Sequence, residues 1–269
     1  MTPKIDAGSL VPTVDRRAED WSAEELHRTF IRYGCAIVRR AAPIQALQEI
    51  EAAILVAYSQ KTEPGFHVYD SDIAEASGGR LTGYEAVDTP LLRAFLALVY
   101  EGQVYRRDSV TARRIQGVEG NEAWQRPLGL HLDSHFHSFQ FTVNFWIPFQ
   151  ECGLEAPGLQ LLPLAYPETR RYCGYTGAIH REGEKSNRGY FRTDYFDRDA
   201  IIKNFGEKAF LRPVMKPGDV VVSSNWILHG SYRTPQMRNG RTNIEVRFIG
   251  DNIDVSGLRP EVSEGAVEA

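Results

Sequence analysis

The second half of the chain is a succession of short runs rich in β-branched and aromatic residues, separated by Gly, Pro and Asn. The runs are Ser109–Val118, Phe139–Phe149, Gly158–Leu162, Ala209–Val214, Asp219–Ser224 and Thr242–Ile249. A parallel α/β sheet would require a helix between successive strands, whereas many short strands with turn residues between them favour a sandwich or barrel. The sequence therefore predicts a fold that is mainly β.

The first part of the chain follows a helical pattern instead. Ser22 and Glu25 have the spacing of a capping box, in which each residue satisfies a backbone amide of the other. Apolar residues at helical spacing predict further helices over Ala42–Tyr58 and Leu91–Val99, with a short strand at Cys35–Val38 between the first two.

The 269 residues suit a single β-rich domain. We expect residues 1–102 to form a helix-rich part that packs on a β core over residues 103–250. Residues 164–205 are polar and rich in Gly, Tyr and Arg, which is typical of an insertion that serves as a lid or binding loop. The acidic, polar residues 251–269 are expected to form a loosely packed tail.

Composition narrows the classes of partner. The net charge of −4 argues against non-specific nucleic-acid binding, which usually needs a basic face. No apolar run reaches the roughly 18 residues of a membrane span, and the first residues lack the apolar region of a secretory signal. The cysteines Cys35, Cys152 and Cys173 form no CxxC pair, so they predict neither a disulfide framework nor a zinc site. We expect a cytoplasmic protein that binds neither membranes nor nucleic acid.

The residues most suited to hold a metal are His131 and Asp133. They are two positions apart, and residues at that spacing on a strand point to the same face. With a second histidine from a distant strand they would form the two-His, one-carboxylate set that leaves open positions on Fe(II). His180 and Glu182 have the same spacing, but they lie in a charged, Gly-flanked stretch without a strand pattern.

A third ligand and an anion-binding residue follow further along the chain. The turn Pro217–Asp219 leads into an apolar strand and then to His229, in the segment NWILHGS. Arg241 opens RTNIEVRF, which alternates like a strand. A buried arginine can hold a carboxylate through two parallel hydrogen bonds. The region from His131 to Arg241 therefore offers a metal triad followed by an anion clamp.

Taken together, these segments resemble the phytanoyl-CoA dioxygenase family of Fe(II)- and 2-oxoglutarate-dependent oxygenases. The resemblance covers roughly residues 105–250. The matching segments are HLD at 131–133, FTVNFWIPF at 141–149, APGLQLLP at 156–163, KPGDVVV at 216–222, LHGS at 228–231 and RTNIEVRF at 241–248.

The resemblance implies a double-stranded β-helix core, of the jelly-roll or cupin-like kind, with flanking helices. It implies that His131, Asp133 and His229 bind Fe(II), and that 2-oxoglutarate and O2 are cosubstrates. Arg241 would bind the distal carboxylate of 2-oxoglutarate, helped by the hydroxyl of Ser231.

Other positions match the family's cofactor cavity less directly. Trp146 falls where the family places an aromatic residue near the cofactor, and Thr142 and Asn144 share its strand face. Arg247 offers a second candidate clamp in a poorer register. Where the family often has a Ser-His pair this chain has LLPLAYPE, so Ala165 and Tyr166 depart from the pattern.

The implied reaction is oxidation of an unactivated C–H bond of a small molecule, with release of succinate and CO2. Family members that halogenate have a small residue in place of the metal-binding carboxylate, so Asp133 favours hydroxylation. The candidate substrate-facing residues are His135 and His137, and Arg188 and Arg192 of the insertion, whose basic character suits either a solvated loop or a lid over an anionic substrate. Its aromatic residues suit an apolar natural-product intermediate equally well.

Two other functions remain open from the sequence. In a cupin-type metalloenzyme that does not use 2-oxoglutarate, His135 and His137 would begin a three-histidine site, but the next glutamate is as far away as Glu151. The other is a non-catalytic jelly-roll protein that binds a ligand or a partner. The intact triad and Arg241 argue against this second alternative.

Overall fold

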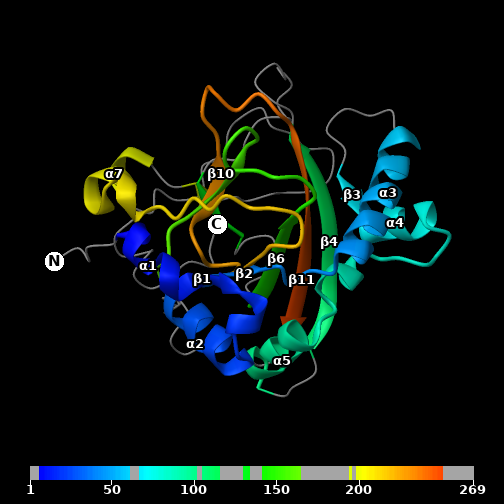
Figure 1. Cartoon of the computed structure of the whole chain (residues 1–269), viewed down its shortest axis with the longest axis horizontal. Coiled ribbons are helices and arrows are strands. Elements are labelled where there is room, and N and C mark those ends of the chain that lie inside the picture. Colours follow the sequence, from blue (N-terminus) through cyan, green and yellow to red (C-terminus); the bar gives the residue numbers. More distant parts are fainter. Residues whose placement is uncertain are drawn as a thin grey trace, which may run out of the picture.

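Two β-sheets face each other in the computed structural model, which describes residues 6–60, 67–101, 105–115, 130–133, 141–164, 194–195 and 198–250 (Figure 1). The larger sheet has seven strands in the order β1-β2-β9-β6-β11-β4-β3, and the smaller has four in the order β7-β10-β5-β8. This arrangement is a double-stranded β-helix with flanking helices. The predicted fold class is confirmed.

All neighbouring strands within the described ranges run antiparallel except β1 and β2, which are parallel. The large sheet consists of β1 (Asp15–Arg17), β2 (Cys35–Arg39), β9 (Val220–Ser224), β6 (Thr142–Pro148), β11 (Arg241–Gly250), β4 (Tyr105–Ile115) and β3 (Val68–Tyr69). The small sheet consists of β7 (Gly158–Leu161), β10 (His229–Tyr232), β5 (His131–Leu132) and β8 (Asp194–Tyr195).

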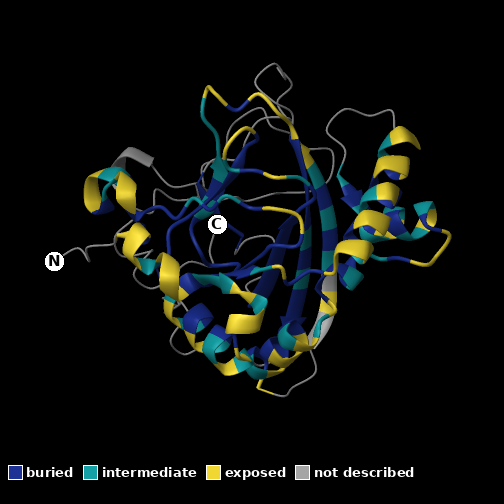
Figure 2. Ribbon diagram, in the orientation of Figure 1, coloured by how far each residue is buried: buried dark blue, intermediate teal, exposed yellow. Residues whose placement is uncertain are grey.

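Helices cover the outer face of the large sheet (Figures 1 and 2). They are α2 (Ala23–Tyr33), α3 (Ile44–Gln60), α4 (Asp70–Ala76) and α5 (Pro90–Val99), with the short 3-10 turns η1 (Ala18–Asp20) and η2 (Tyr84–Val87). The capping box of α2 is confirmed, since Ser22 Oγ accepts from the amide of Glu25 at 3.1 Å and Glu25 Oε2 accepts from the amide of Ser22 at 3.3 Å. The apolar faces of these helices pack on one set of alternating strand residues: Val143, Phe145 and Ile147 of β6, and Ile244, Val246 and Phe248 of β11.

The intervening residues of the same strands therefore point the other way, into the space between the sheets. At one end this space is filled by an apolar cluster that joins Ile37, Trp146 and Val221 of the large sheet to Leu159 and Leu161 of the small sheet. The two short helices α1 (Ala7–Val14) and α7 (Arg198–Phe205) lie at this side of the molecule (Figure 1). Ala7 and Val14 of α1 join this inner cluster, whereas α7 packs on the outer side of the small sheet, with Leu132 of β5 and with Leu228, which directly precedes β10.

A partly buried ion-pair network ties the N-terminal segment to this core. The guanidinium of Arg39 donates to both carboxylate oxygens of Asp15, at 2.6 and 2.5 Å, and to Asp219 at 2.8 Å. Asp219 also accepts from the backbone amides of Arg40, at 3.1 Å, and Lys216, at 2.9 Å. Asp219 therefore fixes the turn that enters β9 and, through Arg39, the position of β1.

The expected strand at Ala209–Val214 is wrong. Ala209 ends a 3-10 turn, η5 (Glu207–Ala209), and Leu211 makes only an isolated bridge to Leu161. Pro213 explains the interruption, since proline has no backbone N–H to donate to a strand ladder. The insertion also departs from a plain loop, because its described part contains β8 and α7.

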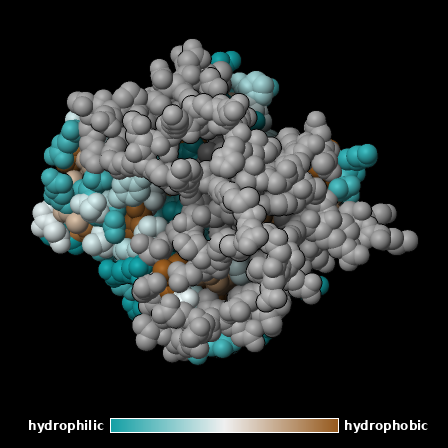
Figure 3. Space-filling view, turned by 180° about the vertical axis from the view of Figure 1, so that it is seen from behind, coloured by the Kyte–Doolittle hydropathy of each residue, from teal (hydrophilic) through white to brown (hydrophobic). Residues whose placement is uncertain are grey.

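The division into a helix-rich part and a core within one domain stays a prediction. Of the 251–269 tail, no residue lies in the described ranges. Among the described residues, no helix is long and apolar enough to cross a membrane. The described surface seen from behind is largely hydrophilic, with small hydrophobic areas between polar ones (Figure 3).

Candidate metal centre

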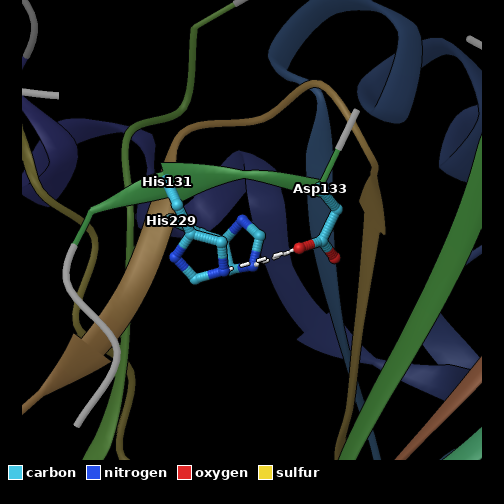
Figure 4. Close-up of side chains that lie close together, drawn as sticks. All are labelled: His131, Asp133 and His229. Carbon is cyan, nitrogen blue, oxygen red and sulfur yellow. Dashed lines mark ion pairs between the residues drawn. The ribbon is translucent and has the colours of Figure 1, made fainter. Parts of the chain in front are cut away.

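The structure brings together His131, Asp133 and His229 on the inner face of the small sheet (Figure 4). His131 begins β5 and Asp133 follows its last residue, while Leu132 between them joins the apolar cluster on the opposite face. His229 begins β10 and is the register partner of His131. The two imidazole ring centroids lie 4.4 Å apart, with the ring planes inclined by 49°.

The donor atoms of these residues converge on one point. Asp133 Oδ1 lies 3.4 Å from His131 Nε2 and 3.7 Å from His229 Nε2. One donor atom from each residue lies within 4.8 Å of the other two. Metal–nitrogen and metal–oxygen bonds are about 2.0–2.2 Å long, so donors around one ion stand about 3 Å apart. A small contraction of the group would bind an ion from one side and leave its other side open.

The surroundings of His229 and Asp133 favour the forms that bind a metal, which are the neutral imidazole and the ionised carboxylate. His229 Nδ1 lies 3.0 Å from the carbonyl oxygen of Ile227, and donation to that oxygen leaves the lone pair of Nε2 facing Asp133. Burial lowers the pKa of His229, and nearby His131 lowers it further, against a partial opposing effect of Asp133. Burial alone would raise the pKa of Asp133, but the two histidines and Arg247 hold it well below its usual range.

The second oxygen of Asp133 is held from the large sheet. Asn144 Nδ2 of β6 donates to Asp133 Oδ2 at 2.8 Å, and Arg247 Nη2 of β11 lies 3.7 Å from the same oxygen. Arg247 also pairs with Glu245. Arg247 therefore contacts two carboxylates, and we find no support for the alternative that it serves as an anion clamp.

Arg241, the predicted clamp, is buried at the start of β11. Its Nη1 donates to the carbonyl oxygens of Pro157 and Gly158, at 2.8 and 2.6 Å, and its guanidinium carbon lies 4.9 Å from the centre of the Trp146 ring. Burial lowers the pKa of Arg241 to about 10, so the group is still charged at neutral pH. Within the described part of the chain, its Nε has no hydrogen-bond partner, and the two acceptors of its Nη1 are neutral carbonyls. A buried charge without a counterion is costly, so this site is suited to an anionic ligand.

The other residues predicted to bind the cofactor are Ser231, Trp146, Thr142 and Asn144. Ser231 is two positions beyond His229 on β10 and shares its inner face, and its register partner Leu159 adjoins Gly158, whose carbonyl binds Arg241. Trp146 lies beneath Arg241. The buried hydroxyl of Thr142 has no partner among the described residues. The side-chain amide of Asn144 contacts Asp133, and its role in binding the cofactor stays a prediction.

The predicted substrate-facing residues cannot be placed. His135, His137, Arg188 and Arg192 lie outside the described residues, as do the competing pair His180 and Glu182 and the departures Ala165 and Tyr166.

Sequence reasoning missed further polar residues on the inner face of the large sheet. On β11 they are Asn243 and Glu245, between Arg241 and Arg247. On β4 and before β3 they are Arg113 and His67, and burial lowers the pKa of His67, with Arg113 adding to the effect. The alternation of RTNIEVRF was the available signal, because it places every second residue from Arg241 on one face.

Comparison with known proteins supports the fold. No protein-family model matches the chain, and no curated protein matches it by sequence. Among solved structures, EctD from S. alaskensis in its apoform is similar with a TM-score of 0.59 and 14% identity, over 86% of this chain and 77% of that one. The epimerase SnoN in complex with Fe3+, alpha ketoglutarate and nogalamycin RO has a TM-score of 0.56 and 14% identity, over 91% of each chain. EvdO2 from Micromonospora carbonacea var. aurantiaca complexed with 2-oxoglutarate has a TM-score of 0.53 and 13% identity, over 87% of this chain and 93% of that one. At these identities the similarity establishes a shared fold.

Proposed function

We propose that the protein is an Fe(II)- and 2-oxoglutarate-dependent dioxygenase, of the phytanoyl-CoA dioxygenase type, that hydroxylates an unactivated C–H bond of a small molecule and releases succinate and CO2. The observation that carries the proposal is the combination of a convergent His131–Asp133–His229 group with the buried cation of Arg241 in the same sandwich. Two of the similar structures, EvdO2 and SnoN, were solved with 2-oxoglutarate bound, and SnoN also with Fe3+, which supports this reaction class.

The donor set fits the proposed metal. Two imidazoles and one carboxylate on one side of an ion are the ligands of non-haem Fe(II) oxygenases, whereas a structural zinc site would be closed by four protein ligands. When bound, Fe(II) and 2-oxoglutarate would supply the electrons that activate O2, which is the oxidant of the reaction. The carboxylate of Asp133 occupies the position that halogenating relatives leave free, which favours hydroxylation.

The chain's own residues would bind and orient the cosubstrate. Arg241 neutralises the carboxylate remote from the metal, and its hydrogen bonds to two carbonyls fix the guanidinium before that carboxylate arrives. Ser231 offers a hydroxyl along the same path. The Trp146 ring forms an apolar wall that excludes water from the charge pair and so strengthens it.

The substrate is proposed to be a small polar or anionic molecule, or a natural-product intermediate, and to be processed in the cytoplasm without nucleic-acid or membrane partners. Support for a polar substrate comes from the inner face near β3 and β4, where His67, Arg113 and Glu245 are only partly buried. Glu245 on β11 is the register partner of Trp146, and Arg113 lies one strand further along the sheet, on β4. We propose that a second molecule reaches the metal from this side.

The proposal is tested anaerobically. Fe(II) and then 2-oxoglutarate are added to the metal-free protein, and the visible spectrum is recorded for the weak absorption of a 2-oxo acid chelated to Fe(II). We expect the band in the wild-type protein, its loss in His131→Ala and its weakening in Arg241→Met. A wild-type protein that binds Fe(II) without giving the band would favour a cupin-type enzyme, and one that binds no Fe(II) would favour a non-catalytic binding protein. Succinate formation then serves to screen substrates.

A further inference from the structure

We propose that Asn144 and Arg247 are positioning residues, which hold Oδ2 of Asp133 away from the metal so that Asp133 presents one oxygen only. A carboxylate can bind an ion through one oxygen or through two. Binding through two would occupy a further coordination position on a centre that needs its open positions for other ligands. The inference rests on the metal site of the proposed function and extends it to residues on the opposite sheet.

The geometry separates the two carboxylate oxygens of Asp133. Oδ1 faces the Nε2 atoms of the two histidines, at 3.4 and 3.7 Å. Oδ2 accepts the 2.8 Å hydrogen bond from Asn144 and lies 3.7 Å from Arg247 Nη2. Figure 4 shows one oxygen directed at the imidazole rings and the other turned away from them.

Both positioning residues are themselves fixed. Asn144 is the register partner of Arg247 on β11 and of Ser223 on β9, so it lies in the middle of the large sheet, and it is 5% exposed. Its side-chain oxygen has no partner among the described residues, so within that part of the chain the amide makes a single hydrogen bond, to Asp133. The Nη2 of Arg247 that lies near Asp133 also pairs with Glu245.

The contacts of Asn144 and Arg247 with Asp133 connect the two sheets. Asp133 and the two histidines come from the small sheet, whereas Asn144 and Arg247 come from the large sheet. The carboxylate is thus oriented by groups that do not move with its own strand. A role limited to satisfying a buried carboxylate would show in the stability of the metal-free protein and would leave metal affinity unchanged.

The first test measures Co(II) binding to the metal-free protein by isothermal titration calorimetry. Loss of groups that orient metal ligands typically weakens metal binding about 10–100-fold. We expect Asn144→Leu, which keeps the branched shape of the side chain and removes the donor, to weaken Co(II) binding at least tenfold and to change the visible spectrum of the Co(II) complex. The matched control is Ser223→Ala, at the neighbouring register position on β9, which should bind Co(II) as the wild type does. A loss smaller than tenfold in folded Asn144→Leu would overturn the proposal.

A second pair of variants keeps the proposal testable if Asn144→Leu does not fold. Arg247→Met removes the charge beside Oδ2 and Arg247→Lys retains one. We expect weaker Co(II) binding in the first and affinity closer to that of the wild type in the second, whereas equal, wild-type affinity in both would overturn the role of Arg247. The two proposals fail separately. A wild-type protein that binds neither Co(II) nor Fe(II) rejects the proposed function, and one that binds Co(II) but not 2-oxoglutarate rejects that function while leaving this inference in place.

Discussion

Arg241 and Gly158 belong to opposite sheets and are joined by a 2.6 Å hydrogen bond from the guanidinium of one to the carbonyl of the other. With the bond to Pro157 at 2.8 Å, this contact closes the sandwich at the end where the cosubstrate's second carboxylate is proposed to bind. The charge is therefore placed before any ligand enters, and a ligand need not reorganise the site in order to use it.

Replacing Arg241 by Met should weaken 2-oxoglutarate binding about 10–100-fold, since a hydrogen bond to a charged group contributes roughly 1.5–3 kcal/mol. Co(II) affinity should change little, because Arg241 does not touch the metal ligands. Calorimetry with the Co(II)-loaded protein measures both. Arg238→Met, at an exposed position before β11, is the matched control. Unaltered 2-oxoglutarate affinity in Arg241→Met would reject the clamp.

Metal binding should raise the thermal unfolding midpoint. An ion that binds only the folded state at 100 times its dissociation constant stabilises that state by about 2.7 kcal/mol. We expect Mn(II) to raise the midpoint of the wild type, a chelator to reverse the shift, and His131→Ala to show no shift. His27→Ala, a half-buried histidine on α2, should respond as the wild type does. An equal response in His131→Ala would place the ion elsewhere.

The Arg39 network predicts a large cost for a single change. Asp219 is buried and accepts hydrogen bonds from Arg39 and from the backbone amides of Arg40 and Lys216. Its removal leaves these donors without that acceptor, at about 1–3 kcal/mol for a buried donor, while Asp15 still pairs with Arg39. Asp219→Ala should therefore lower the free energy of unfolding by about 3 kcal/mol in urea denaturation. The comparison is Asp88→Ala, which breaks the exposed pair with Arg93 and should cost less than about 1 kcal/mol. Similar costs for the two variants would contradict this assignment.

Sequence alternation identified which residues share a face, but it could not identify which strands become neighbours. Thr142, Asn144 and Trp146 lie on one face of β6, as predicted, whereas the contact between Asn144 and Asp133 depends on how the two sheets dock. The strand β1 was not predicted because Asp15–Arg17 is wholly charged. Its stability comes from backbone pairing with β2 and from the bond between Asp15 and Arg39, which no local pattern records.

Glycines at positive φ provide a test of packing. Gly83 has a φ of +90°, and a Cβ atom there would lie 2.7 Å from Val110 Cγ1. Gly79 has a φ of +80° but nothing within 4 Å of such an atom. Gly79→Ala should cost about 1 kcal/mol from backbone strain alone, and Gly83→Ala a further 1–3 kcal/mol from overpacking. Equal denaturation midpoints for Gly79→Ala and Gly83→Ala would show that the side chains around Val110 rearrange to accommodate the added methyl group.

The buried thiols should be inert. Burial raises the pKa of Cys35 to about 12 and that of Cys152 to about 11, from an ordinary value of 9.0. In a Cys173→Ser variant, a thiol-specific disulfide reagent at pH 8 should therefore react with no thiol in the native protein and with two after denaturation.

The raised pKa values of Cys35 and Cys152 also predict that the folded protein loses stability at alkaline pH. The thiols ionise at lower pH in the unfolded chain than in the folded protein, so their contribution to stability is complete below about pH 9 and is lost as the pH rises towards 11 and 12. Urea denaturation midpoints at pH 8 and pH 10 measure this loss. Cys35→Ala should show a smaller decrease between the two pH values than the parent variant.

The metal ligands and the residues that hold Asp133 are spread along the chain from His131 to Arg247 and across both sheets. The centre therefore cannot assemble until β11 has been synthesised and inserted between β4 and β6. A chain that still lacks β11 also lacks Arg241 and Arg247, and with them part of the network around the metal ligands. Capture of the proposed ion would thus be deferred to the completed fold, and the ion would be enclosed only once the surrounding side chains are packed.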